Sequence, residues 1–402
     1  MSPSPHGTQE TTPSLALWRS NRVIGLFPEL LGVGGVQEAG RQIARALDAI
    51  THRHGWEVQI LSLNDARGEH QLPACDFPVR FYGFGRRKTS FVLSMMRQAL
   101  SLDTYKLRVV LAAHPNLAPP ASFIKCFSRS VKTIVMTHGV EVWSRLSLAR
   151  RTSLSHADLV LAPSQDTAEK LTSVQGIPIE KIRKLLWPLN PEFLRLADSP
   201  AGLRLPPGFP QGSIVLTVGR WAKSERYKGL DDLIKATAEL RSSLADLQLV
   251  VVGGGDDLAR HRKLATDAGI ADSVHFLEHL SREELAACYA NADVFALPST
   301  GEGFGLVFLE AMAFAKPIVA ASCGGTMEVV EHGANGLLIP PHNYQSLADA
   351  LNKLLRDDSL RTKLGRGGAE MVRRKHRFRD FELGLDQILE EVAGLHSSRA
   401  RL

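Results

Sequence analysis

Two glutamates, Glu302 and Glu310, flank a glycine-rich turn in the stretch GEGFGLVFLEAM, residues 301–312. The strand-like run VFALPS precedes this turn, and the apolar run LVFLEAMAFA after it predicts a helix. Glu302 therefore lies in a loop and Glu310 about one turn inside the helix. Gly303 and Gly305 allow the backbone amides to approach a ligand closely, and carboxylates accept hydrogen bonds from paired hydroxyls. The spacing predicts two clamps on one elongated polyhydroxyl ligand.

The acid inside the predicted helix needs an explanation of its own. Glu310 follows Phe308 and Leu309 and precedes Ala311 and Met312. An acid in such surroundings must reach solvent or find a partner, because a buried unpaired charge is costly. A ligand hydroxyl pair is one such partner.

Two cations lie in the segment SIVLTVGRWAKSERYKGLDDLI. Arg220 directly follows a strand-like run, and Lys228 begins the next predicted helix. These two charges could flank a pyrophosphate, since arginine makes bidentate contacts to phosphate and lysine acts as a point charge. The alternative is a solvated basic loop, because Lys223 and Arg226 lie nearby. The position after a strand end favours the pyrophosphate.

A glycine loop follows the first strand-like run, in PELLGVGGVQEAG. Gly34 and Gly35 precede a helix predicted to start near Val36. The N-terminus of a helix attracts phosphate, although a tight turn alone explains the glycines equally well. The GxGxxG fingerprint of dinucleotide-binding domains is absent. Asp65 follows the second strand, but an acid there without the glycine pattern is a poor cofactor signal.

Two histidines end strand-like runs in the first half of the chain. His138 lies in THGVEVW and His114 in LAAHPN. Each could face a ligand at the strand ends, or could simply cap its own strand end. Glu141 and Trp143 follow His138 as candidates for ligand or loop contacts.

Strand-like runs alternate with helical patterns along the whole chain. The runs include VIGLF, RVVLAA and DLVLAPS in the first half and SIVLTVG, LQLVVVGG and PIVAAS in the second. Continuous apolar runs are typical of parallel strands buried on both faces, so the fold class is α/β with two Rossmann-like doubly wound domains facing across a cleft. The predicted organisation is a disordered leader at 1–20, a first domain at 21–198, a Pro/Gly-rich linker at 199–212, a second domain at 213–372, and a C-terminal helix at 373–396 that packs back on the first domain.

Composition narrows the class of protein. The 402 residues suit two domains, and 22% charged residues is ordinary for a globular chain. The four cysteines are scattered without a CxxC pair, which predicts reduced thiols and neither disulfides nor a zinc site. A net charge of +6 permits an anionic partner. We find no stretch of about 18 apolar residues, the length that a membrane span needs.

The glutamate pair after a Pro-Ser strand end, followed by KPIVAASCGGTMEVVEHGANGLLIPP, resembles the family 4 retaining glycosyltransferases of the GT-B fold. The resemblance covers residues 21–385 and is most specific over 214–342. It implies that Glu302 contacts the donor sugar, that Glu310 holds the nucleotide ribose, and that the first domain is the acceptor side. The remaining residues that it implicates are Arg220 and Lys228 at the donor diphosphate, Gly34 and Gly35 near the phosphates and reaction centre, His138 beside the transferred sugar, and the backbone amides of Phe304, Gly305 and Leu306 at the diphosphate and sugar.

The activity that this resemblance implies is hexosyl transfer from a nucleotide-diphosphate sugar, with retention, to a glycan or lipid-linked acceptor in cell-surface polysaccharide or glycolipid synthesis. The segments ERYKGLDDLI and HGVEVW look most like members that use GDP-mannose, while UDP-glucose and UDP-N-acetylglucosamine stay open. No Asp-x-Asp pair is present, so we expect no metal and no cofactor beyond the nucleotide sugar. The run WPLNPEF, residues 187–193, departs from the family's pattern and leaves its local turn undefined.

A cytoplasmic protein is expected, with peripheral contact to the inner membrane through the basic segment 80–108. This segment holds Arg80, Arg86, Arg87, Lys88, Arg97, Lys106 and Arg108, interleaved with the apolar run FVLSMMRQAL. A solvated helix packed on its own sheet is the commoner origin of such a pattern. The competing classes are a catalytically silent GT-B scaffold that binds nucleotide sugars and a nucleotide-dependent oxidoreductase. No aromatic-basic surface pattern indicates a nucleic-acid partner.

Overall fold

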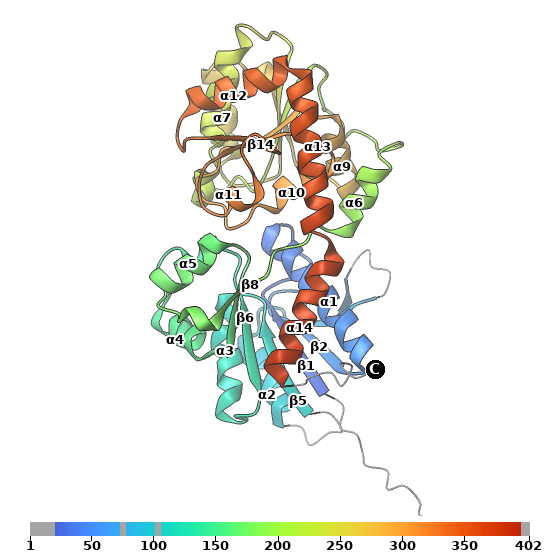
Figure 1. Ribbon diagram of the computed structural model, residues 1–402, viewed down its shortest axis with the longest axis vertical. Helices are drawn as coiled ribbons and strands as arrows, with labels where there is room; N and C mark the ends of the chain where they lie inside the picture. The colour runs from blue at the N-terminus through green and yellow to red at the C-terminus, as the bar shows by residue number, and fades with distance from the viewer. Residues whose placement is uncertain (1–20, 73–77, 101–105, 395–402) are drawn as a thin grey trace, which may run out of the picture.

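The computed structural model describes residues 21–72, 78–100 and 106–394, which form two α/β domains placed end to end (Figure 1). The first domain holds a sheet of order β3-β4-β2-β1-β5-β6-β7-β8, and the second holds a sheet of order β11-β10-β9-β12-β13-β14. The strands are β1 (Asn21–Phe27), β2 (Glu57–Ser62), β3 (Gly68–Gln71), β4 (Arg80–Gly83), β5 (Lys106–Ala112), β6 (Lys132–Met136), β7 (Leu159–Ala162), β8 (Ile182–Lys184), β9 (Ser213–Val218), β10 (Leu247–Val252), β11 (Val274–Leu277), β12 (Val294–Leu297), β13 (Ile318–Ala321) and β14 (Gly336–Ile339). The two doubly wound α/β domains expected from the sequence are confirmed.

Helices connect the strands and cover both faces of each sheet. They are α1 (Gly35–His54), α2 (Lys88–Leu100), α3 (Ala118–Phe123), α4 (Leu148–His156), α5 (Gln165–Ser173), α6 (Pro191–Asp198), α7 (Leu230–Arg241), α8 (Leu258–Asp267), α9 (Arg282–Asn291), α10 (Leu306–Ala313), α11 (Thr326–Val329), α12 (Tyr344–Arg356), α13 (Asp358–Lys375) and α14 (Phe378–Ala393). Short 3-10 helices lie at Pro115–Leu117, Ile124–Cys126, Val140–Val142, Ile179–Lys181, Lys223–Lys228 and Ala271–Ser273.

Strand β1 shows why continuous apolar runs build this fold. Val23 and Phe27 pack into one buried cluster, which α1 joins through Ile43. Ile24 packs on the opposite face with Phe91 of α2. Successive side chains of a strand point to opposite faces, so a strand with a helix layer on each side must be apolar at nearly every position.

Each strand run predicted from the sequence overlaps a strand of the structure, but β3 and β8 were missed. Their sequences, GEHQ and IRK, are short and polar. Both lie at the edges of the first sheet, where polar residues discourage further pairing. Strand β3 is also antiparallel to β4, unlike the parallel pairs elsewhere in the two sheets.

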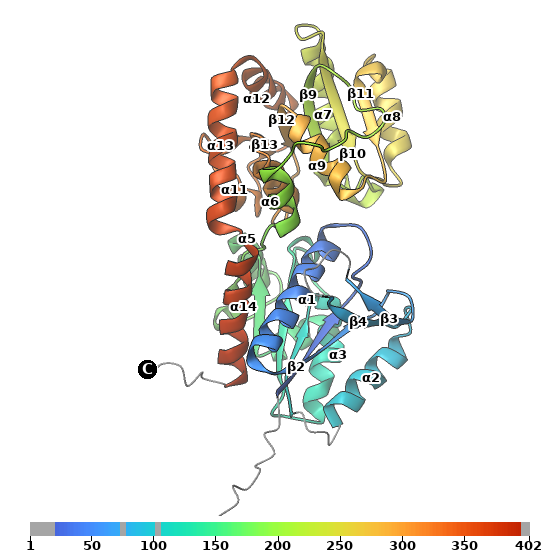
Figure 2. The ribbon, with the colours of Figure 1, turned by 90° about the vertical axis from the view of Figure 1, so that its right-hand side faces the viewer.

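The chain crosses between the domains at a different point from the predicted boundary at 198. Helix α6 packs against α9 and α10 of the second domain, so the crossing comes before α6, in the segment after β8. Helix α14 then runs beside α1 of the first domain (Figure 2). Arg53 of α1 forms an ion pair with Asp386 of α14 at 2.5 Å. The predicted leader 1–20, residues 101–105 of the basic segment, and residues 395 and 396 of the predicted C-terminal helix lie outside the described residues.

Candidate active site

The two domains touch where a loop after β6 meets a loop after β12. Gly139 has a φ of 125°, and a Cβ placed on it would lie 2.2 Å from the Cα of Gly303. A Cβ on Gly303 would lie 2.1 Å from the carbonyl oxygen of His138. The hydroxyl of Ser164 also donates to the carbonyl of Gly303 at 2.9 Å. Only glycine permits this approach, which brings the His138 loop against the Glu302 loop.

Glu310 is buried in α10 and has one protein partner that the sequence did not reveal. Its side chain is 9% exposed, and the phenol of Tyr289 donates to its Oε2 at 2.8 Å. Burial raises the pKa of Glu310 to about 7, and the nearby charge of Glu38 acts in the same direction. The hydrogen bond from Tyr289 and the charge of Arg282 oppose this rise. The carboxyl group therefore changes charge near neutral pH.

Glu38 joins the first-domain glycine loop to the Glu310 region. It lies in the first turn of α1, where the guanidinium of Arg41 contacts it at 2.6 Å. Asn190 donates to its Oε1 at 2.7 Å, and Arg282 of the second domain lies 3.6 Å from its Oε2. Burial alone would raise the pKa of Glu38, but the charges of Arg41 and Arg282 and the hydrogen bonds outweigh it and hold that pKa below its ordinary value. Glu38 thus stays ionised.

The predicted phosphate loop lies at the start of α1. Gly34 is the N-cap residue, and a Cβ on Gly35 would meet nothing within 4 Å, so the backbone there is open. Asp65 proves to be a structural residue of this loop. Its carboxylate accepts hydrogen bonds from the amides of Leu30 and Leu31 at 2.7 and 3.1 Å. Asp65 therefore shapes the approach to the glycines, which explains an acid there without a dinucleotide fingerprint.

Glu302, Lys228 and Arg220 form one charged cluster together with Glu225, which the sequence analysis missed. Glu225 forms an ion pair with Arg220 and lies 3.5 Å from the ammonium of Lys228. Lys228 also lies 3.9 Å from Oε1 of Glu302, an oxygen that has no hydrogen-bond partner among the described residues. Burial raises the pKa of Glu302, while Lys228 and Ser299 lower it. Glu225 thus offsets the positive charges of Arg220 and Lys228, and Oε1 of Glu302 can still accept a hydrogen bond.

His138 is held in a defined orientation. Its Nε2 lies 2.7 Å from the carbonyl oxygen of Ala113. A carbonyl only accepts, so Nε2 must donate and Nδ1 is left for another partner. The ring stacks between His114 at 5.6 Å and Trp187 at 5.3 Å. The backbone amide of His138 donates to Glu141 at 2.6 Å, which makes Glu141 a loop contact.

His114 lies beside His138 but is committed to its own turn. Its Nδ1 accepts from the amide of Asn116 at 3.1 Å. Burial, followed by the charge of His138, lowers the pKa of His114 to about 4. His114 is therefore neutral at pH 7 and supports the ring of its neighbour.

The turn between the two glutamates presents backbone amides to the junction. Gly305 is the N-cap of α10 and makes no side-chain cap hydrogen bond. The amides of Leu306 and Val307 precede every helical acceptor, whereas the amide of Phe308 donates to the carbonyl of Gly305 at 3.0 Å. The side chain of Phe304 is 3% exposed and packs against the ring of His376 at 5.6 Å. Phe304 can thus contribute its backbone, whereas its side chain belongs to the core.

Further polar groups lie at this junction, and of these the sequence pointed to Trp143 but not to Asp166 or Glu328. Trp143 Nε1 and Asp166 Oδ2 are buried and have no hydrogen-bond partner among the described residues. Both side chains lie near Gly324, whose Cβ would come within 3.6 and 3.7 Å of them. Glu328 of α11 accepts from the amides of Gln165 and Asp166 at the start of α5. These contacts join residues more than 100 positions apart, which a single sequence does not reveal.

Among the described residues, one group has metal-ligand spacing, and it lies away from this junction. It consists of His54, Asp386 and Glu390, between α1 and α14. The predicted residues therefore divide into two neighbouring parts of the junction. Arg220, Lys228, Glu302 and the His138 loop form one part, while Glu310 and the Gly34–Gly35 loop approach each other through Glu38 and Arg282.

Family models match both domains. Residues 34–185 match the model described as a glycosyl transferase 4-like domain, and residues 208–371 match the model described as glycosyl transferases group 1. The structure is also similar to sucrose-phosphate synthase from Thermosynechococcus elongatus, with a TM-score of 0.74, 24% identity, and coverage of 94% of this chain and 100% of that one. A glycosyltransferase from Rickettsia africae gives a TM-score of 0.71 with 17% identity, covering 93% and 98%. These two structures define the fold as GT-B.

The chain belongs to the family 4 glycosyltransferases of the GT-B fold. A relative from Mycobacterium tuberculosis, a GDP-mannose-dependent alpha-(1-6)-phosphatidylinositol monomannoside mannosyltransferase, is 34% identical over 255 residues, which are 60% of this chain and 65% of that protein. A D-inositol 3-phosphate glycosyltransferase from Corynebacterium jeikeium is 41% identical over 155 residues, 37% of each chain. The chain spans less than two thirds of the length of either relative.

Proposed function

We propose that this chain transfers a hexose, with retention of configuration, from a nucleotide-diphosphate sugar to a glycan or lipid-linked acceptor. The observation that carries the proposal is the interdomain junction, where the Glu302–Lys228–Arg220 cluster meets the His138 loop through Gly139 and Gly303. An acid with an unused acceptor oxygen lies there beside two cations. Such a set suits a polyhydroxyl group joined to a diphosphate.

In this proposal the donor lies across the junction. Glu310 accepts hydrogen bonds from the ribose hydroxyls, and Tyr289 holds its other oxygen. The amides at the starts of α1 and α10, together with Arg220 and Lys228, hold the diphosphate. Glu302 accepts from a hydroxyl of the sugar, and Nδ1 of His138 contacts the same sugar. Apart from the contact of Tyr289, these roles are the ones that the family resemblance implies.

The chemistry breaks the bond between the anomeric carbon and the diphosphate oxygen. Negative charge develops on the leaving diphosphate, and fixed cations and helix amides stabilise it most when they are already in place. The acceptor hydroxyl attacks from the same face and passes its proton to the leaving phosphate. We propose that no metal takes part, because two protein cations already meet the leaving group.

GDP-mannose is the proposed donor, with UDP-glucose and UDP-N-acetylglucosamine as alternatives. The mycobacterial relative is a GDP-mannose-dependent phosphatidylinositol monomannoside mannosyltransferase, which supports GDP-mannose and a lipid-linked acceptor. The described helices include none that is long and apolar enough to cross a membrane. We propose a cytoplasmic protein that contacts the membrane surface through the exposed residues Arg86, Arg87 and Lys88 of the basic segment.

A turnover experiment tests this function. The full chain is incubated with each of the three nucleotide sugars and a membrane glycolipid extract, with and without EDTA. We expect nucleotide release and a new glycosylated product with one donor, unchanged by EDTA, and NMR of that product should show the donor's anomeric configuration. Binding of a donor without release or product would instead indicate a catalytically silent scaffold.

A further inference from the structure

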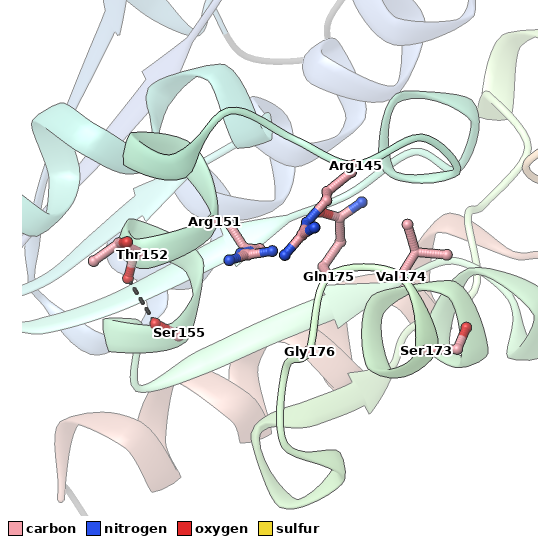
Figure 3. Close-up of a pocket in the computed structure, with 8 residues that line it drawn as sticks. All are labelled: Arg145, Arg151, Thr152, Ser155, Ser173, Val174, Gln175 and Gly176. Atoms are coloured by element: carbon pink, nitrogen blue, oxygen red, sulfur yellow. Dashed lines mark hydrogen bonds between the residues drawn. The ribbon is translucent and has the colours of Figure 1, made fainter.

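A hollow of about 650 Å³ opens between α4 and the end of α5 in the first domain (Figure 3). Residues from three segments line it. The loop before α4 contributes Arg145, α4 contributes Arg151, Thr152 and Ser155, and the end of α5 with the following turn contributes Ser173, Val174, Gln175 and Gly176. No acid is among these eight residues. The hollow is distinct from the junction described above, none of whose site residues line it.

Two guanidinium groups extend into this hollow. Figure 3 shows the side chains of Arg145 and Arg151 directed into the same space from different segments. Neither guanidinium has a hydrogen bond or an ion pair within the described part of the chain, in contrast with Arg183, whose guanidinium is paired with Glu391 at 2.6 Å. Two like charges that share one hollow repel each other. An anion bound between them would be attracted to both and would offset that repulsion.

The remaining lining groups favour a phosphate. Thr152 places a hydroxyl-bearing side chain at the wall, and hydroxyls donate readily to phosphate oxygens. The hydroxyls of Ser155 and Ser173 already donate to the carbonyls of Thr152 and Glu169, at 2.8 and 2.7 Å. The ammonium of Lys181 lies against the same wall, donating to the carbonyl of Ser155 at 2.6 Å. Arginine forks match the spacing of phosphate oxygens and bind them bidentately. The net charge of the lining therefore favours an anion, and the two forks together with the Thr152 hydroxyl suit the several oxygens of a phosphate group.

The wall of the hollow is rigidly built. Gln175 is 2% exposed, and its amide nitrogen donates to the carbonyls of Val142 and Ser144, each at 2.7 Å. Its Oε1 accepts from the amide of Leu146 at 3.1 Å. These bonds fix the backbone on both sides of Arg145. The segment that Gln175 holds, from Val142 to Leu146, follows the His138 loop directly in the chain, so Gln175 also helps to fix the backbone next to the junction.

We propose that this hollow binds the phosphate group of a ligand between Arg145 and Arg151. The phosphate belongs either to a soluble phosphorylated compound or to a lipid headgroup. The proposal does not depend on the activity assigned to the junction, because it uses none of the donor-site residues.

Binding of inorganic phosphate tests the site directly. The full chain carries Lys228→Ala throughout, which weakens phosphate binding at the donor site, and melting temperature is followed while sodium phosphate replaces sodium chloride at constant ionic strength. We expect a saturable rise of about 2 to 4 °C, because a ligand that binds the native state stabilises it by mass action. Arg145→Gln with Arg151→Gln should abolish the rise. The matched control, Arg129→Gln with Arg204→Gln, removes the same charge from exposed positions outside the hollow and the basic segment and should keep it.

A second arm identifies the source of the phosphate. Cosedimentation with phosphatidylcholine vesicles containing phosphatidic acid is compared between the two double variants. Loss of cosedimentation only in the Arg145/Arg151 variant assigns the hollow to a lipid headgroup, while equal cosedimentation together with the lost phosphate response assigns it to a soluble ligand. The proposal is overturned if phosphate raises the melting temperature equally in both double variants, or in neither the parent nor the variants.

Discussion

The phenol of Tyr289 donates a 2.8 Å hydrogen bond to Oε2 of Glu310 in the core of the second domain. This bond supplies the partner that a buried acid requires and orients the carboxyl group. It also occupies only one of the two oxygens. The other is available to a ligand hydroxyl, and burial keeps the pKa of the group at about 7.

Nucleotide affinity should therefore depend on pH through Glu310. An ionised carboxylate accepts two hydroxyl hydrogen bonds, and with a pKa of about 7 the ionised fraction rises from roughly a tenth at pH 6 to roughly nine tenths at pH 8. We expect the affinity for the nucleoside diphosphate to rise about tenfold over this range, measured by calorimetry. In Glu310→Gln the part of the rise that belongs to this group should vanish. An identical pH profile in the variant would count against the ribose contact.

Stability should respond to pH with the opposite sign. The pKa of Glu310 is raised from 4.5 to about 7 on folding, so the native state holds this proton more tightly than the unfolded chain. The contribution of Glu310 to the free energy of unfolding is complete below pH 4.5 and is lost as the pH rises to about 7. The loss from this group is at most about 3 kcal/mol. Urea unfolding of the wild type and Glu310→Gln at pH 5 and pH 8 measures it. From pH 5 to pH 8 the free energy of unfolding should fall more in the wild type than in Glu310→Gln. An equal fall in the two proteins would show that the carboxyl group is not desolvated.

Glu225 should restrain binding of the diphosphate. Its carboxylate pairs with Arg220 and lies 3.5 Å from Lys228, so it competes with phosphate oxygens for both cations. We expect Glu225→Gln to tighten the binding of the nucleoside diphosphate several-fold at low salt, and Lys228→Ala to weaken it at least tenfold, because charge-assisted hydrogen bonds to phosphate are strong. Glu278→Gln, which breaks the Arg262–Glu278 pair elsewhere on the second domain, is the matched control. Weaker binding in Glu225→Gln would mean that Glu225 positions the cations for the donor.

Gly303 should be essential for the meeting of the two loops. A Cβ at this position would lie 2.1 Å from the carbonyl oxygen of His138 and 2.6 Å from the Cα of Gly139, so Gly303→Ala must push the loops apart. Small displacements of reacting groups cost about a hundredfold in rate, and we expect a loss of that order in kcat with nucleotide binding retained. Gly254→Ala, whose Cβ would meet nothing closer than 3.5 Å, should stay active. Full activity in Gly303→Ala would show that the loop contact is not used in catalysis.

The sequence predicted the elements that follow from local patterns. Continuous apolar runs identified the buried strands. The position after a strand end pointed to Arg220 and Glu302, and the predicted start of a helix pointed to Lys228; the structure gathers these three into one cluster. Periodicity could not detect β3 or β8, because edge strands have polar residues and little burial.

Partners that come from distant segments were beyond the sequence. Tyr289 lies on a helix whose inward residues look like ordinary core, and nothing local shows that its hydroxyl meets Glu310. Glu38 and Arg282 come from different domains and meet only once the domains are assembled. One signal was present. A buried tyrosine hydroxyl requires a hydrogen-bond partner, and the apolar neighbours of Glu310 showed that this acid requires one too, so the two could have been paired.

Thermal-shift binding of nucleotides tests the central claim most directly. GDP, UDP and ADP, each compared with its sugar form, are added to the wild type, to Glu310→Ala and to Glu370→Ala, which removes an exposed acid from α13 as a control. A ligand that binds the native state raises the melting temperature by mass action. We predict that GDP and GDP-mannose raise it in the wild type and in Glu370→Ala, and that the rise is lost in Glu310→Ala. No shift with any nucleotide, or an equal shift in Glu310→Ala, would contradict the assignment of the glutamate pair to a nucleotide-sugar donor.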